Sequence, residues 1–485
     1  MKSEDEQDRY DLLENGSIRS ILKNRKTQFL FQLPAVLLLV LVVFAGFFGI
    51  QNSNKNLATI SIWVIWWSLL IISLALFGRS WCFMCPFGAI GDWVQRRTFY
   101  KKVNDTFSLN RKWPAKFRDL SLAALFFLVI TWADFQFDLV NSPLNTAYFL
   151  VAILGLIVII SIIFERRSFC RYACPITGLI GLYSMFAPLE LRAKEKETCK
   201  TCKKKYCISG NENGYECPVF EYPGTMEKNA NCVLCTECVK TCHFDEPNII
   251  SSFSTGSSNR ENISFNIRSF AGDLFTLTKT RMDEALFILM LLGVTIFQTL
   301  VMIRPWAGIT RDLMIYTGAS YDSIRFILFI TAAVFPVLIY SIAIAIAIAI
   351  SKLFDQKIIF KDLITSYAYS IIPLGLMMHL SHNIRHLLEE GTGIIPVLSD
   401  PFGFGWNLFG TSGYMPAPLP GSNNILLIQW LLMLVGLGFS ISIGKNISRR
   451  MFHGNNCAYI PVLIFVLIFF VFNLWVLGQP IMHKH

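Results

Sequence analysis

Residues 232–242 read Cys-Val-Leu-Cys-Thr-Glu-Cys-Val-Lys-Thr-Cys. The four cysteines follow the spacing C-x2-C-x2-C-x3-C, which is typical of a bacterial-type 4Fe–4S site. In such a site three close thiolates hold one cubane and the fourth ligates a second cluster. Twelve of the thirteen cysteines of the chain lie between Cys82 and Cys242. The run therefore predicts a chain that moves electrons.

A second group of cysteines lies just upstream and could share ligands with this run, so that each group contributes one cysteine to the cluster of the other. We expect two 4Fe–4S clusters with crossed ligands, one on Cys199, Cys202, Cys207 and Cys242 and the other on Cys217, Cys232, Cys235 and Cys238. A zinc ribbon and a disulfide framework are the alternatives. Zinc has no need of Cys238 and Cys242, and the cytoplasmic placement derived below disfavours disulfides. The upstream set has wider and less regular gaps than the run.

Composition places these cysteines in a membrane protein. The chain has 485 residues, 53% of them hydrophobic, with 41 Phe and a mean hydropathy of +0.48. Nine apolar runs reach the length of about 20 residues that a membrane-spanning helix needs. We expect an all-α polytopic membrane protein with an inserted small α+β two-cluster ferredoxin-like domain. The nine spans are expected near residues 29–50, 57–78, 119–137, 147–164, 285–303, 326–351, 364–388, 424–443 and 457–478.

These spans divide the chain into five parts. We expect a leader (1–28), a four-helix membrane unit (29–189), a ferredoxin-like domain (190–250), a linker (251–284) and a five-helix membrane unit (285–485). Loop 79–118 carries nine Lys and Arg and loop 165–284 carries sixteen, whereas 138–146 and 389–423 carry none. Basic loops favour the cytoplasmic side, so we expect a multi-pass protein of the cell (inner) membrane with its N-terminus and cluster domain in the cytoplasm. The leader shows no signal-peptide cleavage pattern, so we expect the first span to be retained. The net charge of +10 is then explained by anchoring at the lipid bilayer, and no nucleic-acid partner is needed.

An internal repeat carries the other four cysteines. Residues 79–86 read Arg-Ser-Trp-Cys-Phe-Met-Cys-Pro, and residues 167–175 read Arg-Ser-Phe-Cys-Arg-Tyr-Ala-Cys-Pro. Each copy closes a hairpin of two spans. The repeat therefore predicts that Cys82, Cys85, Cys170 and Cys174 meet at one membrane depth. Four such thiols suit a third Fe–S cluster or a tetrahedral metal, a pair of redox-active dithiols, or simple packing at helix ends.

Three histidines mark the C-terminal half. His379, His382 and His386 are three, four and seven residues apart, so they share one face of a helix inside a predicted span. A divalent metal or a quinone head group fits this face, and a polar contact between helices is the structural alternative. A haem needs axial ligands from two opposite sides, and no other span holds a histidine.

Two hairpins that end in C-x2/3-C-P, followed by a two-cluster ferredoxin domain, resemble the NapH/NosR-type membrane polyferredoxins, which also include the CcoG-like proteins. The resemblance covers about residues 29–250. It implies membrane-anchored electron transfer between a quinol pool or cytoplasmic donor and an extracytoplasmic or metal-centred acceptor. His243 stands after Cys242 where the regular motif has proline, and no flavin-attachment domain of the NosR type is recognisable.

We therefore expect a membrane iron–sulfur electron-transfer protein that links cytoplasmic clusters to a quinone or to an extracytoplasmic redox partner. Whether it is an oxidoreductase subunit of the quinol dehydrogenase type stays open. Two rival functions remain. One is a metal transporter or metal reductase that uses the clusters as its electron supply. The other is a redox-sensing regulatory or assembly subunit.

Overall fold

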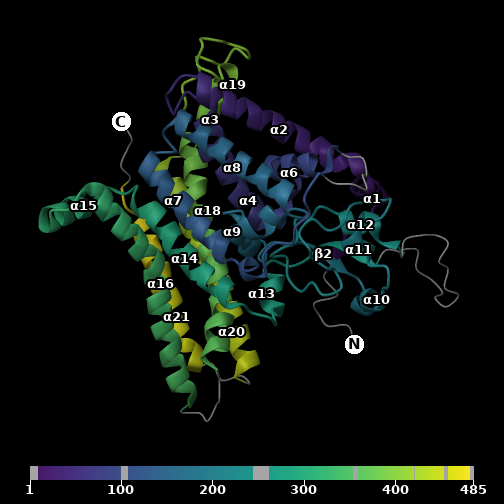
Figure 1. The fold of residues 1–485 in the computed structure, drawn as a ribbon. Helices are drawn as coiled ribbons and strands as arrows, with labels where there is room; N and C mark the ends of the chain where they lie inside the picture. The colour runs from purple at the N-terminus through teal and green to yellow at the C-terminus, as the bar shows by residue number, and fades with distance from the viewer. Residues whose placement is uncertain are drawn as a thin grey trace. The chain divides into compact units, whose positions relative to one another are not determined.

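The computed structural model describes residues 9–99, 107–243, 262–352, 359–419, 421–452 and 457–480. The fold is mostly helical, with one small sheet (Figure 1). The chain divides into two compact units. Unit 1 comprises Met1–Val43, Ser73–Ala123 and Phe149–Asp273, and unit 2 comprises Phe44–Ile72, Ala124–Tyr148 and Leu274–His485. All twelve clustered cysteines therefore belong to unit 1, and the three histidines belong to unit 2.

Eight helical segments in the described part of the chain are long and apolar enough to cross a membrane. They are Arg25–Phe48, Leu57–Arg96, Pro143–Ile163, Met282–Leu300, Tyr321–Lys352, Phe360–Ser399, Asn424–Met451 and Cys457–Leu477. Each corresponds to one of the nine expected spans. The remaining span, expected at 119–137, is α7 (Ser121–Phe137), an apolar helix of only 17 residues. The Asp119 carboxylate accepts the Ser121 N–H before the first turn, and Asp138 follows the last turn with a φ of 49°.

Unit 1 contains the sheet and the short helices around the cysteines. Its elements are β1 (Tyr10–Asp11), α1 (Gly16–Lys23), the first part of α2 (Arg25–Phe48), α5 (Trp81–Met84), α6 (Pro86–Arg96), most of α8 (Pro143–Ile163), α9 (Thr177–Tyr183), β2 (Leu189–Ala193), α10 (Lys196–Thr201), α11 (Tyr206–Ser209), α12 (Glu237–Thr241) and β3 (Ile263–Ile267). The sheet order is β1-β3-β2 and both pairings are antiparallel.

Strand β3 falls in the segment 251–284, for which the sequence predicted only a linker. Residues 251–261 of that segment lie outside the described residues. In β3 the side chains of Ile263 and Phe265 join a core that also contains Leu13 and Leu191. The alternation of apolar and polar residues in Ile-Ser-Phe-Asn-Ile is the period of a strand with one apolar face, which explains why the segment pairs instead of remaining a loop.

Unit 2 is a helical membrane unit. Its elements include α3 (Leu57–Thr59), a π-helical segment (Ile60–Trp66), α7, α14 (Met282–Leu300), α15 (Arg304–Thr317), α16 (Tyr321–Lys352), α17 (Phe360–Ala368), α18 (Ile372–Glu390), α19 (Ile394–Ser399), α20 (Ser422–Met451) and α21 (Ile460–Leu477), with α4 (Trp67–Phe77) and α13 (Gly272–Thr276) shared with unit 1.

Close packing of helix pairs holds unit 2 together (Figure 1). Helix α14 packs along α16, where a Cβ on Gly293 would meet the Ala332 carbonyl oxygen at 1.8 Å, so glycine permits this approach. Helix α18 packs along α20, and Gln429 Nε2 donates to the Ser381 carbonyl oxygen at 2.8 Å. The segment Phe360–Ser399, which includes α18 and its histidines, is largely buried inside the unit.

Candidate functional site

The loop that carries Cys232, Cys235 and Cys238 has a backbone suited to binding anionic sulfur. Leu234 and Thr236 adopt left-handed conformations, with φ of 51° and 59°. Alternation of right- and left-handed residues turns successive backbone N–H groups toward one point, which is a feature of many Fe–S sites. Burial raises the pKa of the Cys232 thiol to about 12, and the Leu234 N–H acts in the opposite direction. The loop thus offers backbone N–H donors to sulfurs of cysteines that are partly or fully buried.

Cys217 completes the group that the spacing predicted. Burial raises the pKa of the Cys238 thiol well above its usual range, and Cys235, Cys232 and Cys217 raise it further. These four side chains therefore lie close enough to interact electrostatically. The Glu221 N–H points at Cys217 Sγ at 3.3 Å. We call Cys217, Cys232, Cys235 and Cys238 the inner group.

The other four cysteines of this region also come together. The pKa of the Cys207 thiol is raised to about 12, mainly by burial and then by the nearby Cys199, Cys242 and Cys202. The Lys205 N–H lies 3.4 Å from Cys202 Sγ. Asn262 Nδ2 donates to Cys199 Sγ at 3.2 Å. We call Cys199, Cys202, Cys207 and Cys242 the outer group. The fold gathers the two sets that crossed ligation requires, although Cys242 is far from Cys199 in sequence.

The two hairpin repeats also bring their cysteines together. Cys85 precedes α6, whose first residue is Pro86, and Cys174 follows a π-helical turn (Phe169–Ala173). Burial raises the pKa of the Cys174 thiol well above its usual range, and Cys170, Cys85 and Cys82 raise it further. We call Cys82, Cys85, Cys170 and Cys174 the hairpin group.

The three groups adjoin one another within unit 1. Cys82 and Cys217 both pack against a small core formed by Val219, Val233 and Cys235, which joins the hairpin group to the inner group. The inner and outer groups interact through Cys207, whose charge acts on Cys238. The order is therefore hairpin group, inner group, outer group.

Arginines of the second hairpin hold the cysteine loops in place. Arg166 Nη1 donates to the Cys217 carbonyl oxygen at 3.2 Å, and its Nη2 donates to the Ile208 carbonyl oxygen at 3.0 Å. Arg171, which lies between the two hairpin cysteines, pairs with Glu221 at 2.7 Å. The basic residues near the second hairpin motif thus hold the cysteine loops in place, in addition to marking the predicted cytoplasmic side of the membrane.

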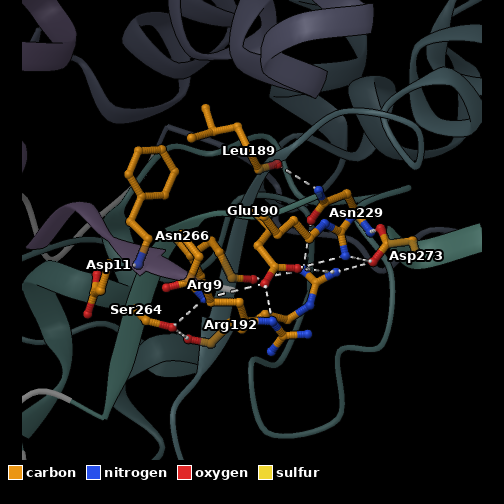
Figure 2. Close-up of polar contacts among 12 residues, drawn as sticks. Arg9, Asp11, Leu189, Glu190, Arg192, Asn229, Ser264, Asn266 and Asp273 are labelled. Atoms are coloured by element: carbon orange, nitrogen blue, oxygen red, sulfur yellow. Dashed lines mark hydrogen bonds and ion pairs between the residues drawn. The ribbon is translucent and has the colours of Figure 1, made fainter. Parts of the chain in front are cut away.

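A buried ion network anchors the start of the cysteine run (Figure 2). Arg192 Nη2 lies 2.6 Å from Asp273 Oδ1, and Arg268 Nη1 lies 2.8 Å from Glu190 Oε2. Arg192 Nη1 also donates to Asn229 Oδ1 at 2.7 Å. Burial alone would raise the pKa of Asp273, but Arg192 and Arg268 hold it below its ordinary value. The sequence did not predict this network, because its partners come from separate segments. The available signal was the pair of charged residues inside the apolar alternation at 189–193.

The cysteine groups have the donor chemistry of 4Fe–4S clusters. All thirteen cysteines are described, and none of them forms a disulfide. Within the described residues no three His, Cys, Asp or Glu side chains converge on a point that could hold one metal ion. A tetrahedral zinc needs four sulfurs at about 2.3 Å from one centre. A cubane presents a separate iron to each of four thiolates, so a group of four cysteines can supply all its ligands.

The histidines of α18 have separate partners. His379 is buried, and its ring lies 6.1 Å from that of Trp67. His382 Nδ1 and Thr299 Oγ1 of α14 are 3.1 Å apart. His386 Nδ1 lies 3.1 Å from Glu390 Oε1, and the rings of His382 and His386 are 5.0 Å apart. The three histidines do not converge as ligands of one ion in the described structure.

Comparison with known proteins supports the iron–sulfur interpretation. A family described as a 4Fe-4S binding domain matches residues 60–114 and 146–191, which contain the four hairpin cysteines. An uncharacterized protein of Methanocaldococcus jannaschii is 24% identical over 176 residues, 36% of this chain and 64% of that protein. YccM of Escherichia coli K12, named as a candidate electron transport protein, is 31% identical over 88 residues, 18% of this chain and 22% of YccM. No solved structure matches significantly.

The chain thus spans less than two thirds of the length of these curated relatives. The matches support a 4Fe–4S protein with a role in electron transfer, and the apolar helices indicate a multi-pass membrane protein.

Proposed function

We propose that the protein is a membrane electron-transfer protein that carries two 4Fe–4S clusters on its inner and outer groups and a third centre on its hairpin group. One observation carries this proposal: twelve cysteines from five separate stretches of sequence gather in three adjoining groups of four within one unit. A 4Fe–4S cluster supplies reversible one-electron transfer. Adjoining groups keep each transfer step short.

The finer assignment follows the positive-inside rule and the resemblance to NapH/NosR-type proteins. The N-terminus and the cysteine groups are assigned to the cytoplasmic side. The clusters exchange electrons with a quinone or with a redox partner at the opposite face of the membrane. The His382–Thr299 pair and the Arg385–Glu389 pair, which is 3.0 Å long, offer hydrogen-bonding groups for a quinone near the end of α18. We favour a quinone at this face because both pairs place hydrogen-bonding side chains there.

Metal and sulfide content of anaerobically purified, full-length protein tests the proposal. We expect about twelve non-haem irons per chain for three cubanes, or about eight if the hairpin group holds none, with matching acid-labile sulfide. The Cys235→Ser variant should lose one cluster signal, and Cys457→Ser, which alters the one cysteine outside the groups, should lose none. Stoichiometric zinc without sulfide would overturn the proposal.

A further inference from the structure

Arg79, at the start of the first hairpin motif, is a buried cation without a carboxylate partner among the described residues. Arg79 is 2% exposed. Nη1 donates to the Ala230 carbonyl oxygen at 2.6 Å, and Nη2 donates to Thr177 Oγ1 at 3.1 Å. Nε has no hydrogen-bond partner. Nη2 also lies 4.0 Å from Cys82 Sγ.

The equivalent residue of the second hairpin is in the opposite situation. Arg167 Nη2 and Nε both donate to Asp92 Oδ2, at 2.6 and 2.9 Å, so its charge is matched. Arg167 Nη1 donates to the Cys82 carbonyl oxygen at 3.1 Å. Each arginine therefore reaches from its own motif to the other hairpin: Arg79 to Thr177, and Arg167 to Asp92.

An unmatched guanidinium is costly to bury unless an anion lies beside it. Arg79 contacts only neutral oxygens and one thiol of the hairpin group. Four thiolates with a 4Fe–4S core carry net negative charge, which would supply the missing anion. The structural alternative, in which the hairpin cysteines are only packing residues, leaves the buried charge of Arg79 unexplained.

We propose that Arg79 is the counter-cation of an anionic 4Fe–4S cluster bound by Cys82, Cys85, Cys170 and Cys174. This inference rests on the proposed function, because it needs cluster-bound cysteines in unit 1. Arg79 is a positioning residue: it ties the hairpin group to the Ala230 segment, two residues before Cys232. Its charge favours the reduced cluster, which is the more negative form, and so raises the reduction potential of the hairpin centre.

Potentiometric titration of the full-length protein, followed by electron paramagnetic resonance, tests this inference. In wild type we expect three cluster signals. Arg79→Gln should lower the midpoint potential of one signal and leave the other two unchanged, whereas Arg79→Lys should restore most of the shift. Cys82→Ser should remove that same signal. The two unchanged signals show that each variant has folded.

The outcomes separate this inference from the proposed function. If the variant with all four hairpin cysteines changed to Ser keeps the iron content and every cluster signal of the wild type, the inference is wrong and the two-cluster function stands. If wild type contains no 4Fe–4S cluster, the proposed function itself fails. An equal shift of all three potentials in Arg79→Gln would also overturn the specific role of Arg79.

A second, independent observation concerns the surface over the outer group. Lys203, Lys204 and Lys205 are consecutive, exposed, and directly follow Cys202. The Lys204 ammonium lies 5.5 Å from the Tyr206 ring centre, and the Lys205 ammonium lies 5.3 Å from that of Tyr222.

The aromatic neighbours connect these lysines to the sulfurs. The Tyr222 hydroxyl donates to the Cys199 carbonyl oxygen. Cys202 and Cys207, the outer-group cysteines on either side of the lysines, are also only partly buried. A centre that exchanges electrons with a soluble protein must lie near the surface, and a basic rim steers an acidic partner toward it.

We infer that this lysine surface docks an acidic, soluble one-electron carrier protein. In each encounter the reduced carrier loses one electron and this protein gains one, with no bond or proton exchanged. Stopped-flow reduction with a reduced acidic ferredoxin as the probe tests the surface. The variant K203E/K204E should lower the second-order rate at least about tenfold at low salt, and the difference should shrink as salt is added.

The matched control K112E/K116E reverses two other exposed lysines of unit 1 and should leave the rate unchanged. Reduction by methyl viologen radical should be equal in all variants, which shows that the centres are intact. A rate that does not respond to K203E/K204E or to salt would overturn the inference. So would a loss that occurs only in anionic-lipid nanodiscs and not in detergent, because the lysines would then bind the membrane surface.

Discussion

The backbone N–H of Asn229 donates to Asp273 Oδ2 at 2.6 Å, although 44 residues separate the two along the chain. The Asn229 carbonyl oxygen then accepts the N–H of Cys232 at 3.1 Å, so this contact fixes the beginning of the cysteine run. Asp273 is 1% exposed and also pairs with Arg192 and Arg268. The carboxylate of Asp273, the last residue of unit 1, therefore sets the position of an inner-group cysteine.

We expect Asp273→Asn to destabilise unit 1 by about 3–5 kcal/mol, because it leaves buried arginines without their partner. Loss of cluster absorbance on heating should occur at a lower temperature, with the inner-group signal affected first. Glu197→Gln is the matched control, since the exposed Glu197–Lys200 pair should contribute nothing measurable. Equal thermal loss in the two variants would show that the network does not support the cysteine loop.

The lowered pKa of Asp273 gives a pH dependence with a defined sign. A carboxylate whose folded pKa is depressed adds stability above its ordinary pKa of about 3.9, and this stability is lost as the pH falls through the folded pKa. Apoprotein should therefore keep the contribution from neutral pH to about pH 4 and lose it only in stronger acid. Tryptophan-fluorescence unfolding curves of wild type and Asp273→Asn should differ at pH 6 and converge in strong acid. A constant difference at every pH would contradict the assignment.

If the ligands are crossed, two cysteine variants of the same group should lose the same cluster signal. Cys217→Ser and Cys238→Ser should remove one and the same cluster signal, because both belong to the inner group. Cys207→Ser and Cys242→Ser should remove the other. Electron paramagnetic resonance of the four variants decides the question. If Cys217→Ser and Cys207→Ser remove the same signal instead, the ligands follow the order of the sequence and the crossed assignment is wrong.

Burial of the thiols predicts slow chemical modification of the apoprotein. The pKa of Cys207 and of Cys232 is raised to about 12, whereas a free cysteine has a pKa of about 8.5. Only the thiolate reacts, so alkylation by iodoacetamide at pH 8 should be at least about a hundredfold slower in folded apoprotein than in urea. Mass spectrometry should show the folded rate rising about tenfold per pH unit between pH 8 and 10. A pH-independent rate would mean that local opening, not ionisation, limits the reaction.

Cysteine spacing and hydropathy predicted most of the membrane helices and the grouping of the cysteines, because both depend on short-range patterns. The C-x2-C-x2-C-x3-C run needs only local turns at Leu234 and Thr236 to aim its sulfurs. The crossed sets remain a prediction, as does cluster binding by the hairpin group. The family match to the two hairpin segments shows that the repeat was an informative signal.

Long-range pairing could not be predicted in the same way. Strand β3 follows the inner and outer cysteine groups, whereas its partners β1 and β2 precede them. Its five-residue alternation suits a strand, but it does not identify which distant segments it pairs with. Arg167 has a carboxylate partner because its guanidinium reaches Asp92 of the first hairpin, whereas the guanidinium of Arg79 reaches the neutral Thr177 of the second. Their motifs, Arg-Ser-Trp-Cys and Arg-Ser-Phe-Cys, are nearly identical, so only the packed structure separates them.

The C-terminal half of α18, from His382 onward, is the site for the last prediction. His382 and Thr299 connect α18 to α14 through a 3.1 Å contact. A neutral imidazole at this position can accept a proton from a bound quinol, and polar groups inside a membrane helix mark functional sites by default. We expect His382→Ala to lower quinol oxidation at least about tenfold, while chemical reduction of the clusters by dithionite stays unchanged.

Two further variants distinguish a quinone site from a helix contact. Thr299→Val removes the hydrogen bond but keeps the shape of the side chain, so it should have a smaller effect than His382→Ala. His386→Ala alters a histidine nearer the end of α18, paired with Glu390, and should change quinol affinity more than the maximal rate. Cluster content is measured in each variant to confirm that unit 1 is intact. If quinol oxidation survives replacement of His379, His382 and His386 together, the histidines only join helices, and the quinone is bound elsewhere or not at all.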